Sequence, residues 1–422
     1  MKTVSRSLLF IFLLVSCTSP DQHLQFEQEP MIRVLLADGK SSVTLSFSGE
    51  IEATNDKVHF NKNSTITFTA SQGQIDVQED NTTLFRADSL KLLPDDQIKI
   101  DDVPYGVGWW WGGEEDRLYS GELYVHADSD SALQVILHLP LEEYVKGVIP
   151  YEIGVDSPIE ALKAQALAAR TESAKALREG KYRGDRYDIC ADVDCQVYAG
   201  DNKRTPRTDS AVTLTSGEVI VYEYELIDAY FASNCGGKSE RVEKVWPWRG
   251  GAKPYLVSNY DSKKEVLPID PHSSPEKWIN SSPEVYCNPE LHPQLPSWSK
   301  KNFRWERAIP LNELTLDDEI VSDLRIIERG ESGRLHQVEV TVPSGKIVLD
   351  YELAIRKLTN PPLRSSNFVF RKNIDEWVFT GAGWGHGVGL CQSGAVARAY
   401  EGHQYSEILR HYYVGSEIVT VY

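Results

Sequence analysis

Two kinds of hydrophobic pattern divide the chain. From Met31 to about Lys99, apolar and polar residues alternate in short runs such as Val43, Leu45 and Phe47, and Asn, Asp, Gly and Ser separate these runs. A period of two is typical of half-buried strands, so this region is predicted to be a β-rich leading domain. Similar runs in residues 117–139, 211–230 and 324–379 are also expected to form strands.

A helical pattern first appears in residues 141–170, LEEYVKGVIPYEIGVDSPIEALKAQALAAR. Leu141, Tyr144, Val145 and Val148 have the spacing of one buried helix face. Pro150 is expected to end this helix, because proline has no N–H to continue the hydrogen-bonding pattern.

A second helix is expected to begin just after this break. Ser157, Pro158 and Glu160 fit the N-cap, N1 and N3 positions of a capping box, with proline at the first helical position. Gly180 provides the stop. Residues 395–413 also have helical periodicity.

One carboxylate, Glu152, lies in the connection between the two helices. Rigid elements on both sides hold it at a helix end, where a carboxylate can face a cleft, and that position suits a catalytic acid. The alternative is an ordinary surface carboxylate. From this stretch alone the surface interpretation is favoured, since most Glu side chains are solvated.

The first residues predict export. Lys2 and Arg6 precede an apolar run over residues 8–15, which is a signal segment too short to span a membrane. Residues 14–17, LVSC, resemble the lipobox of bacterial lipoproteins, which implies cleavage before Cys17, a lipid on that cysteine and a polar tether up to Pro30. A plain signal peptide cut nearby is the alternative.

Length and charge limit the class of protein. With 422 residues the chain has room for two or three domains. Its formal net charge is -18, and loss of Lys2 and Arg6 with the signal segment gives -20 for the mature protein. Such an acidic chain is not expected to bind nucleic acid, and its substrate is expected to be neutral or to lie in a locally basic groove.

Cys190, Cys195, Cys235, Cys287 and Cys391 remain after Cys17, and disulfides are allowed outside the cytoplasm. Cys190 and Cys195 resemble half of a zinc site, but a structural zinc ion requires four ligands and residues 187–198 contain no His. A local disulfide or two free thiols competes equally well. For Cys235, in the turn-rich loop 232–240, a structural thiol is the expectation.

Two aromatic stretches are candidates for surface contacts. Trp109, Trp110 and Trp111 follow one another between glycines, and successive strand residues point to opposite faces, so one of them is free to stack on a sugar ring. The alternative, that two are core residues and one is incidental, is slightly favoured. Residues 244–308 are rich in Trp and Pro with little periodicity, which is typical of a functional or elaborated surface loop.

Residues 381–394, GAGWGHGVGLCQSG, have glycine at every second position up to Gly389. The missing Cβ atoms permit unusual dihedrals and close approach of a ligand or another backbone. The stretch lacks the ending of a phosphate-binding loop and the order of a dinucleotide fingerprint. His386 is a candidate site residue in this setting, although a lone His is more often structural.

Two distant stretches together resemble the stage II sporulation protein D and amidase-enhancer family of bacterial cell-wall proteins. They are LEEYVKGVIPYEI with PIEALKAQALAAR, and GWGHGVGLCQSGA followed by EILRHYYVG. Weaker matches are CADVDCQVY, the SNCGGKSE loop running to PYLVSNYD, and SGRLHQVEVTVPSG through RSSNF, so the resemblance covers roughly residues 118–422.

The resemblance implies a lytic transglycosylase that acts on peptidoglycan glycan strands stripped of stem peptides, with Glu152 as the catalytic residue. One carboxyl group suffices if it first protonates the glycosidic oxygen and then accepts the C6 hydroxyl proton, closing a 1,6-anhydro ring. No cofactor is required. Some relatives bind zinc through Cys and His, but here Asp194 stands where a His would precede Cys195, so a structural zinc at Cys190 and Cys195 is the less favoured alternative.

Two other functions compete with this expectation. Some members of the family are thought to be non-catalytic wall-binding proteins that stimulate a cell-wall amidase. In addition, Cys391 stands where Ser is commoner and places a thiol near His386 in the sequence, which suggests, more weakly, a thiol hydrolase.

The expected architecture is α+β, with a few helices packed around a substrate groove after a mainly β N-terminal region. The expected divisions are a signal peptide (1–16), a tether (17–30), the β-rich region (31–116) and the family domain (117–422) with an irregular insertion at about 244–308. The expected partners are glycan strands, the membrane through Cys17 and a cell-wall amidase, in the bacterial envelope. The residues expected to bind substrate are Tyr151, Gln165, Arg170, Tyr198, Trp384, His386, Gln392 and Ser393.

Overall fold

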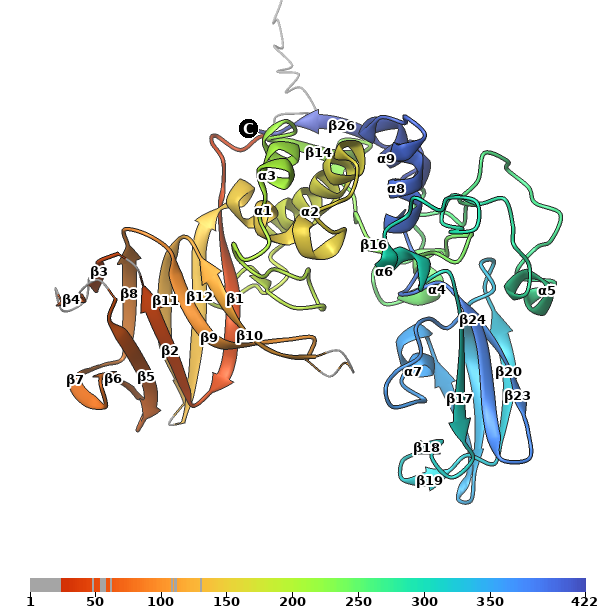
Figure 1. Cartoon of the computed structure of the whole chain (residues 1–422), viewed down its shortest axis with the longest axis horizontal. Coiled ribbons are helices and arrows are strands. Elements are labelled where there is room, and N and C mark those ends of the chain that lie inside the picture. The colour runs from red at the N-terminus through yellow and green to blue at the C-terminus, as the bar shows by residue number, and fades with distance from the viewer. Residues whose placement is uncertain are drawn as a thin grey trace, which may run out of the picture.

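The computed structural model describes residues 24–47, 49–53, 58–60, 63–107, 109, 112–129 and 131–422. The signal segment, Cys17, Trp110 and Trp111 lie outside the described residues. The fold is α+β, as predicted, with a mainly β N-terminal part (Figure 1). Within these ranges, none of the helices is both long enough and apolar enough to cross a membrane.

The N-terminal part is built from two sheets. The first has the order β13-β1-β12-β11-β8-β3-β4 and the second β10-β9-β2-β5-β6-β7. Their strands are β1 (Met31–Lys40), β2 (Ser42–Phe47), β3 (Ile51–Ala53), β4 (Val58–Phe60), β5 (Thr65–Ser71), β6 (Gln74–Glu79), β7 (Thr82–Ala87), β8 (Ser89–Pro94), β9 (Ile98–Tyr105), β10 (Gly113–Tyr119), β11 (Glu122–Ser129), β12 (Ala132–Pro140) and β13 (Ile189–Cys190).

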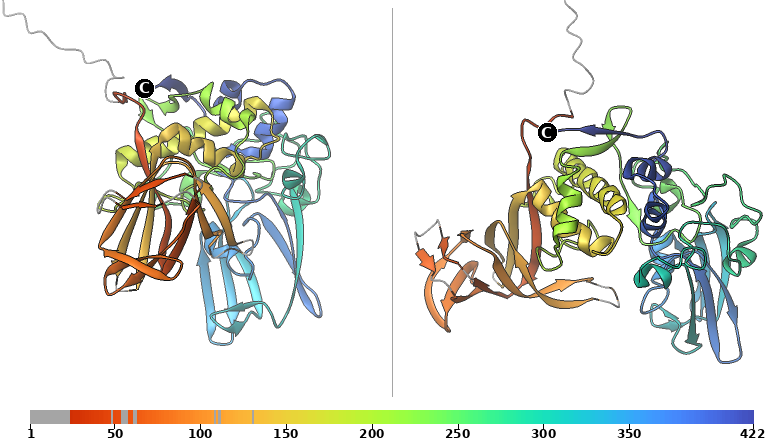
Figure 2. Two further views of the ribbon diagram at one scale, coloured as in Figure 1. Left: turned by 60° about the vertical axis from the view of Figure 1, so that its left-hand side comes forward. Right: turned by 45° about the horizontal axis from the view of Figure 1, so that its top comes forward.

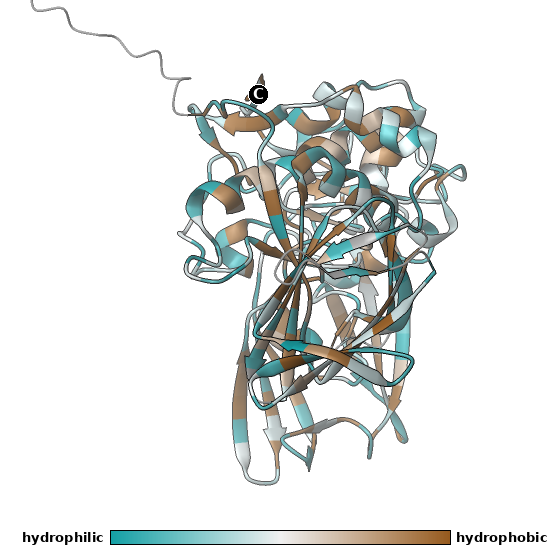
Figure 3. Cartoon of the chain, turned by 90° about the vertical axis from the view of Figure 1, so that its left-hand side faces the viewer, coloured by the Kyte–Doolittle hydropathy of each residue, from teal (hydrophilic) through white to brown (hydrophobic). Residues whose placement is uncertain are grey.

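The alternating pattern of the sequence produces the core of this part. In β2, Val43, Leu45 and Phe47 are buried while the residues between them are partly exposed, as a period of two predicts. Hydrophobic and hydrophilic segments alternate along the strands in Figure 3. The strand pairing continues across the boundary expected at residues 116 and 117, because β11 and β12 belong to the same sheet as β1.

Three helices follow: α1 (Leu141–Glu152), α2 (Ile159–Glu179) and α3 (Pro206–Thr213). Helix α2 is central, since Ala161 and Leu162 belong to the core shared with the N-terminal sheets, whereas Ala164 and Leu167 belong to the core shared with the C-terminal helices. Gly180 ends α2 in the left-handed conformation, at φ +63°, as the sequence predicted.

Two predictions about the helix ends were wrong. Pro150 does not end α1 but lies buried inside it, and Ile153 N–H still bonds to Ile149 O at 3.2 Å beyond the proline. Ser157 does not cap α2, whose N-cap is Pro158. The Ser157 hydroxyl instead donates to Ile153 O at 2.7 Å and so fastens the end of α1.

The remaining elements form a helical layer and a second, C-terminal β body. The layer contains β14 (Glu218–Tyr222), β15 (Glu225–Leu226), β16 (Phe231–Ala232), α4 (Val242–Val245), α5 (Pro275–Ile279), α6 (Ser297–Lys300), β25 (Leu390–Cys391), α8 (Gln392–Tyr400), α9 (Tyr405–Tyr412) and β26 (Glu417–Thr420). The β body contains β17 (Arg304–Pro310), β18 (Thr315–Leu316), β19 (Glu319–Ile320), β20 (Asp323–Arg329), β21 (Leu335–Val342), β22 (Gly345–Asp350), α7 (Glu352–Arg356), β23 (Phe368–Lys372) and β24 (Glu376–Ala382).

The helices join the two β bodies, which lie on opposite sides of the molecule (Figures 1 and 2). The C-terminal β body has its own apolar core, which includes Trp305, Trp377 and Phe379. One contact reaches across from the N-terminal part: the Arg356 guanidinium of α7 lies 4.8 Å from the ring centroid of Trp109, between β9 and β10. Residues 244–308 have little regular structure, as predicted, with α5 and α6 as short helices within them.

Candidate functional site

Glu152 is the last residue of α1, and a glycine turn follows it. Gly154 has φ +83°, a conformation that L side chains rarely adopt, and its hydrogens face the indole of Trp298. The sequence Ile153-Gly154 therefore provides the turn that carries the chain from α1 to α2. This turn fixes Glu152 at the carboxyl end of a helix.

The Glu152 side chain is half-buried and accepts hydrogen bonds from two neutral donors. Its Oε1 accepts from Val197 N–H at 2.9 Å, and its Oε2 accepts from Gln392 Nε2 at 3.3 Å. Within the described part of the chain, no Lys, Arg or His nitrogen lies within ion-pair distance of this carboxylate. Burial raises the pKa of Glu152, while the bonds from Val197 and Gln392 partly oppose the increase.

Gln392 and Gln165 were expected near the site, and the structure places them beside Glu152. Gln392 begins α8, near the end of the glycine-rich stretch, and its Nε2 also lies 3.2 Å from Gln165 Oε1. Gln165 is fully buried in α2. Three distant segments thus meet at one carboxylate, and the two motifs of the sequence are joined by direct side-chain contacts.

The glycine-rich stretch passes very close to other backbone and side-chain atoms. A Cβ at Gly387 would lie 2.2 Å from Arg334 Cζ, and one at Gly389 would lie 2.1 Å from Tyr230 O. Close approach therefore explains the glycines at these two positions. The packing positions β25 beside β16 and leads the chain into α8 and Gln392.

His386 lies in this stretch, and both of its ring nitrogens contact main-chain groups. Its Nε2 is 2.9 Å from Phe231 O, and its Nδ1 accepts from Val388 N–H at 3.0 Å. Burial, with the nearby charge of Arg334, lowers the pKa of His386 to about 3, so the ring is neutral at physiological pH. Both ring nitrogens are therefore engaged by main-chain groups.

The suggested pairing of His386 with Cys391 is wrong. Both His386 nitrogens bond to main-chain groups, and Cys391 is buried against Cys235, whose N–H lies 3.2 Å from Cys391 Sγ. A thiol hydrolase needs its base within hydrogen-bond distance of the thiol. The geometry therefore gives this hypothesis no support.

Arg170 and Tyr198 were expected to bind substrate, but both are buried in the scaffold. Arg170 forms two hydrogen bonds with Glu142, at 2.9 and 2.7 Å, and also donates to two main-chain carbonyls. Tyr198 is 1% exposed and stacks on Tyr144 with ring centroids 4.9 Å apart. Arginine and tyrosine side chains occur both at surfaces and in cores, so their burial here could not be predicted from residue type.

Three other expected residues lie in different settings. Tyr151 is half-buried, with Lys203 Nζ 4.0 Å from its ring centroid. Trp384 pairs with Asn234 in an isolated bridge and has the Arg364 guanidinium 5.2 Å from its ring. Ser393 is buried, and its hydroxyl donates to Ser233 O at 2.7 Å. Trp384 and Tyr151 are thus partly accessible, whereas Ser393 supports the fold.

An aromatic group next to His386 was not expected from the sequence. The Trp246 ring lies 4.7 Å from His386 and 5.0 Å from Tyr230, and the Arg249 guanidinium lies 4.7 Å from Trp246. Trp246 and Arg249 come from the irregular region. Its high Trp content was the only feature of the sequence that pointed to aromatic side chains at a site. The Val197 N–H that binds Glu152 is a main-chain group and leaves no signal in a sequence.

Cys190 and Cys195 lie side by side near Asp194, as the expected zinc half-site would require. These residues provide three candidate ligands, fewer than the four of a structural zinc site. Lys181 Nζ, a cation, lies 3.2 Å from Cys195 Sγ. The described residues at this position therefore do not complete a tetrahedral zinc site.

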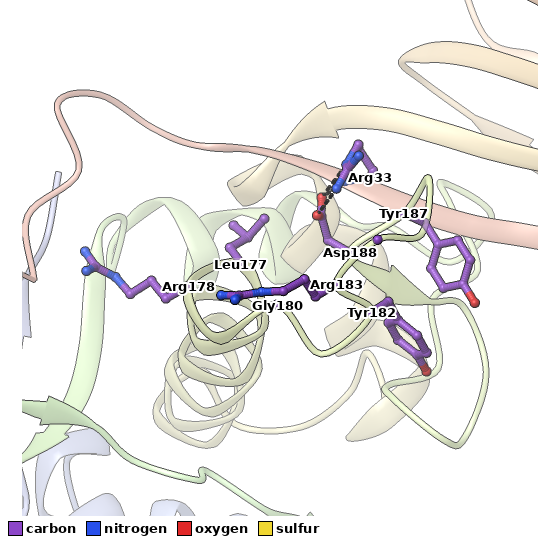
Figure 4. A pocket seen from close by; sticks show the side chains of 9 residues that line it. Arg33, Leu177, Arg178, Gly180, Tyr182, Arg183, Tyr187 and Asp188 are labelled. Atoms are coloured by element: carbon purple, nitrogen blue, oxygen red, sulfur yellow. Dashed lines mark hydrogen bonds and ion pairs between the residues drawn. The ribbon is translucent and has the colours of Figure 1, made fainter.

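A small polar pocket of about 220 Å³ lies at the end of α2 (Figure 4). Arg33, Arg178 and Arg183 are among its lining residues, and Arg33 forms an ion pair with Asp188 at 2.6 Å. Glu152 and its hydrogen-bond partners do not line this pocket. It is separate from the candidate site.

Comparison with known proteins assigns the family. A family model described as stage II sporulation protein matches residues 129–222, which contain α1, α2 and Glu152. The stage II sporulation protein D of Bacillus subtilis is 30% identical over 301 residues, which cover 68% of this chain and 77% of that protein. The chain belongs to the stage II sporulation protein D family. This assignment confirms the resemblance that the two motifs indicated.

Other relatives extend the comparison. An uncharacterized protein of Brachyspira hyodysenteriae is 28% identical over 407 residues, covering 93% of this chain and 94% of that protein. The amidase enhancer of Bacillus subtilis is 29% identical over 301 residues, covering 65% of this chain but 40% of that protein. A second family model, described as a domain of unknown function, matches residues 240–389.

Proposed function

We propose that this protein is a peptidoglycan lytic transglycosylase with Glu152 as its acid and base. The proposal rests on the environment of the Glu152 carboxyl group. The group is half-buried, it accepts hydrogen bonds from two neutral donors, and burial raises its pKa. A raised pKa makes a carboxyl group hold its proton to higher pH than usual, which favours its donation to a glycosidic oxygen.

The proposed reaction needs one carboxyl group. Protonated Glu152 donates its proton to the glycosidic oxygen as the bond to C1 of the muramoyl residue breaks. The resulting carboxylate then accepts the proton of the C6 hydroxyl, whose oxygen bonds to C1 and closes the 1,6-anhydro ring. Hydrolytic glycosidases generally use a second carboxyl group to activate water or act as nucleophile, and this route needs neither.

The proposed glycan contacts are the accessible aromatic faces. The rings of Trp246, Tyr230 and His386 lie within 6.5 Å of one another, and Trp384 is partly exposed in the same glycine-rich stretch. Aromatic faces suit sugar rings, because a ring presents a flat apolar surface with polar groups around its edge. These aromatic residues are proposed to bind the glycan, whereas Glu152 is proposed to carry out the chemical step.

The product of digestion tests the chemistry. Peptide-stripped glycan strands incubated with the protein are expected to yield 1,6-anhydromuramoyl ends by mass spectrometry, and Glu152→Gln should abolish them. Glu143→Gln is the matched control, because Glu143 lies on the same helix but bonds to Lys146 and Arg204. Hydrated reducing ends, or full activity of Glu152→Gln, would refute the proposal.

A second candidate function is stimulation of a cell-wall amidase without catalysis. The similarity to the Bacillus subtilis amidase enhancer favours it. In that case Glu152→Gln should retain glycan binding and should stimulate the amidase as well as the wild type does. The same variant therefore separates the two functions.

We also propose that the protein works in the cell envelope, attached through a lipid on Cys17. The support is the sequence around that cysteine. Cys17→Ala should move the protein from the membrane fraction to the soluble exported fraction. An unchanged membrane fraction would contradict the lipid anchor while leaving the proposed chemistry untouched.

A further inference from the structure

Three cysteines that are far apart in the chain meet beside one aspartate. Cys235 follows β16, Cys391 ends β25, and Asp261 and Cys287 both come from the irregular region before β17. All four residues are buried, and one possible ligand atom from each lies within 4.8 Å of the other three. We call Cys235, Asp261, Cys287 and Cys391 the buried cysteine cluster.

The spacing of this cluster matches a tetrahedral metal site. Zn–S bonds of about 2.3 Å at tetrahedral angles place two sulfur atoms about 3.8 Å apart. Cys235 Sγ and Cys287 Sγ are 3.7 Å apart. Three thiolates and one carboxylate also make up four ligands, the number that a structural zinc ion requires.

The groups around the cluster hold its ligands in place. Cys235 N–H points at Cys391 Sγ at 3.2 Å. Asp261 accepts from Cys287 N–H at 3.1 Å and from Tyr412 Oη at 2.8 Å. Hydrogen bonds of this kind orient the ligands of metal sites and are part of their design.

Among the described residues, two cations near the cluster have no carboxylate partner of their own, whereas a third, Arg398, lies 3.4 Å from Asp261 Oδ1. Arg334 is fully buried and donates to Cys235 O at 3.1 Å, and Arg304 donates to Gly236 O at 3.1 Å. In the described part of the chain, neither guanidinium has an Asp or Glu oxygen among its hydrogen-bond partners. Buried cations need compensating negative charge, which a thiolate-rich metal site supplies.

Disulfide bonding does not account for the cluster equally well. The remaining two cysteines of the mature chain after Cys17, Cys190 and Cys195, lie together at a different place. A single disulfide within the cluster would leave its third thiol unpaired, whereas one zinc ion engages all three.

We propose that the buried cysteine cluster binds a structural Zn²⁺ ion through Cys235, Asp261, Cys287 and Cys391. The ion ties the irregular region to the paired strands β16 and β25. Gln392, the residue after Cys391, bonds to Glu152. The metal therefore also fixes the wall of the site that carries this amide. The proposal stands on the cluster itself and does not depend on the reaction proposed for Glu152.

The zinc content of the exported protein tests this. The full chain, produced with its own signal segment and purified from the envelope without chelators, should contain about one zinc ion per chain by elemental mass spectrometry. Cys287→Ser should lower the zinc content at least tenfold. Cys190→Ser, in the other cysteine group, should leave it unchanged. A metal-free wild type after growth with added zinc, or loss of zinc in Cys190→Ser alone, would overturn the proposal.

A measurement on the wild type covers the case in which Cys287→Ser does not fold. Cys235, Cys287 and Cys391 should resist alkylation in the native protein and should all become alkylated, without reductant, once the protein is denatured with a chelator. Peptides joined by a disulfide between any two of the three would refute the zinc site. Glycan cleavage is not used in either experiment, so failure of this proposal is distinguishable from failure of the proposed function.

Discussion

Replacing Arg170 with alanine is expected to destabilise the whole central helix assembly. The Arg170 side chain is fully buried, that of Glu142 is 9% exposed, and the closest N–O pair is 2.7 Å apart. Arg170 also donates to Glu218 O and Val212 O, so it connects α1 and α2 to α3 and β14. Its removal leaves a buried carboxylate without its cation.

The magnitude follows from what remains around Glu142. Removing one partner of a buried ion pair typically costs about 3–5 kcal/mol. Gly217 N–H and the hydroxyls of Ser216 and Tyr422 still donate to Glu142 Oε1 in the variant. These donors favour the lower end of the range, about 3 kcal/mol.

The dependence of stability on pH tests whether ionised Glu142 stabilises or destabilises the folded protein. Burial alone would raise the pKa of Glu142, but the charge and hydrogen bonds of Arg170, with Tyr422 and Gly217, lower it below its ordinary value of 4.5. The ionised carboxylate therefore stabilises the folded wild type above about pH 4.5, and this contribution is lost as the pH falls through the lowered pKa. In Arg170→Ala the effect of burial dominates, so the ionised form becomes unfavourable.

Urea denaturation at pH 4 and pH 7 measures this difference. The loss of stability in Arg170→Ala should be larger at pH 7 than at pH 4, and Glu142→Gln in the same background should recover part of it. A variant as stable as wild type at pH 7 would contradict the structural role and would favour the substrate-binding role expected from the sequence.

Three further changes have defined outcomes. Gln392→Ala removes a hydrogen bond that lowers the pKa of Glu152, so the alkaline limit of glycan cleavage should move to higher pH; an unmoved limit would show that this amide does not act on the carboxyl group. Gly147→Ala should lower the free energy of unfolding, measured with urea, by about 1–3 kcal/mol although alanine has the better helix propensity, because a Cβ would lie 2.4 Å from the Tyr198 ring, and a gain in stability would refute this packing. Burial and a neighbouring negative charge raise the pKa of Glu172 to about 7, so wild-type stability should fall as the pH rises through 7; thermal midpoints at pH 6 and 8 should show this fall in wild type but not in Glu172→Gln.

Local sequence signals predicted the regular elements well. The period of two in β2 and the glycine that ends α2 at Gly180 depend on one segment and its solvent exposure, so both were predictable. The structural roles of Pro150 and Ser157 were predicted wrongly, because tertiary contacts determine them. Pro150 is buried within α1, and the Ser157 hydroxyl has a carbonyl of the preceding turn as its acceptor.

The candidate site was only partly predictable for a similar reason. Glu152 and Gln392 were both selected as site residues, because each lies in a motif that resembles the family, and the structure places them in direct contact. Arg170 carries the same charge whether it lies at a surface or inside a core, and only the position of Glu142 decides between them. The buried cysteine cluster could not be found from spacing, since its members are brought together by three separate segments.

Digestion of peptide-stripped glycan strands by wild type and Glu152→Gln distinguishes a catalytic Glu152 from a structural one. If Glu152 is the acid and base, the wild type and Glu143→Gln produce 1,6-anhydromuramoyl ends, and Glu152→Gln of equal thermal stability produces none. Anhydro ends produced by Glu152→Gln at the wild-type rate would show that Glu152 is not the catalytic residue.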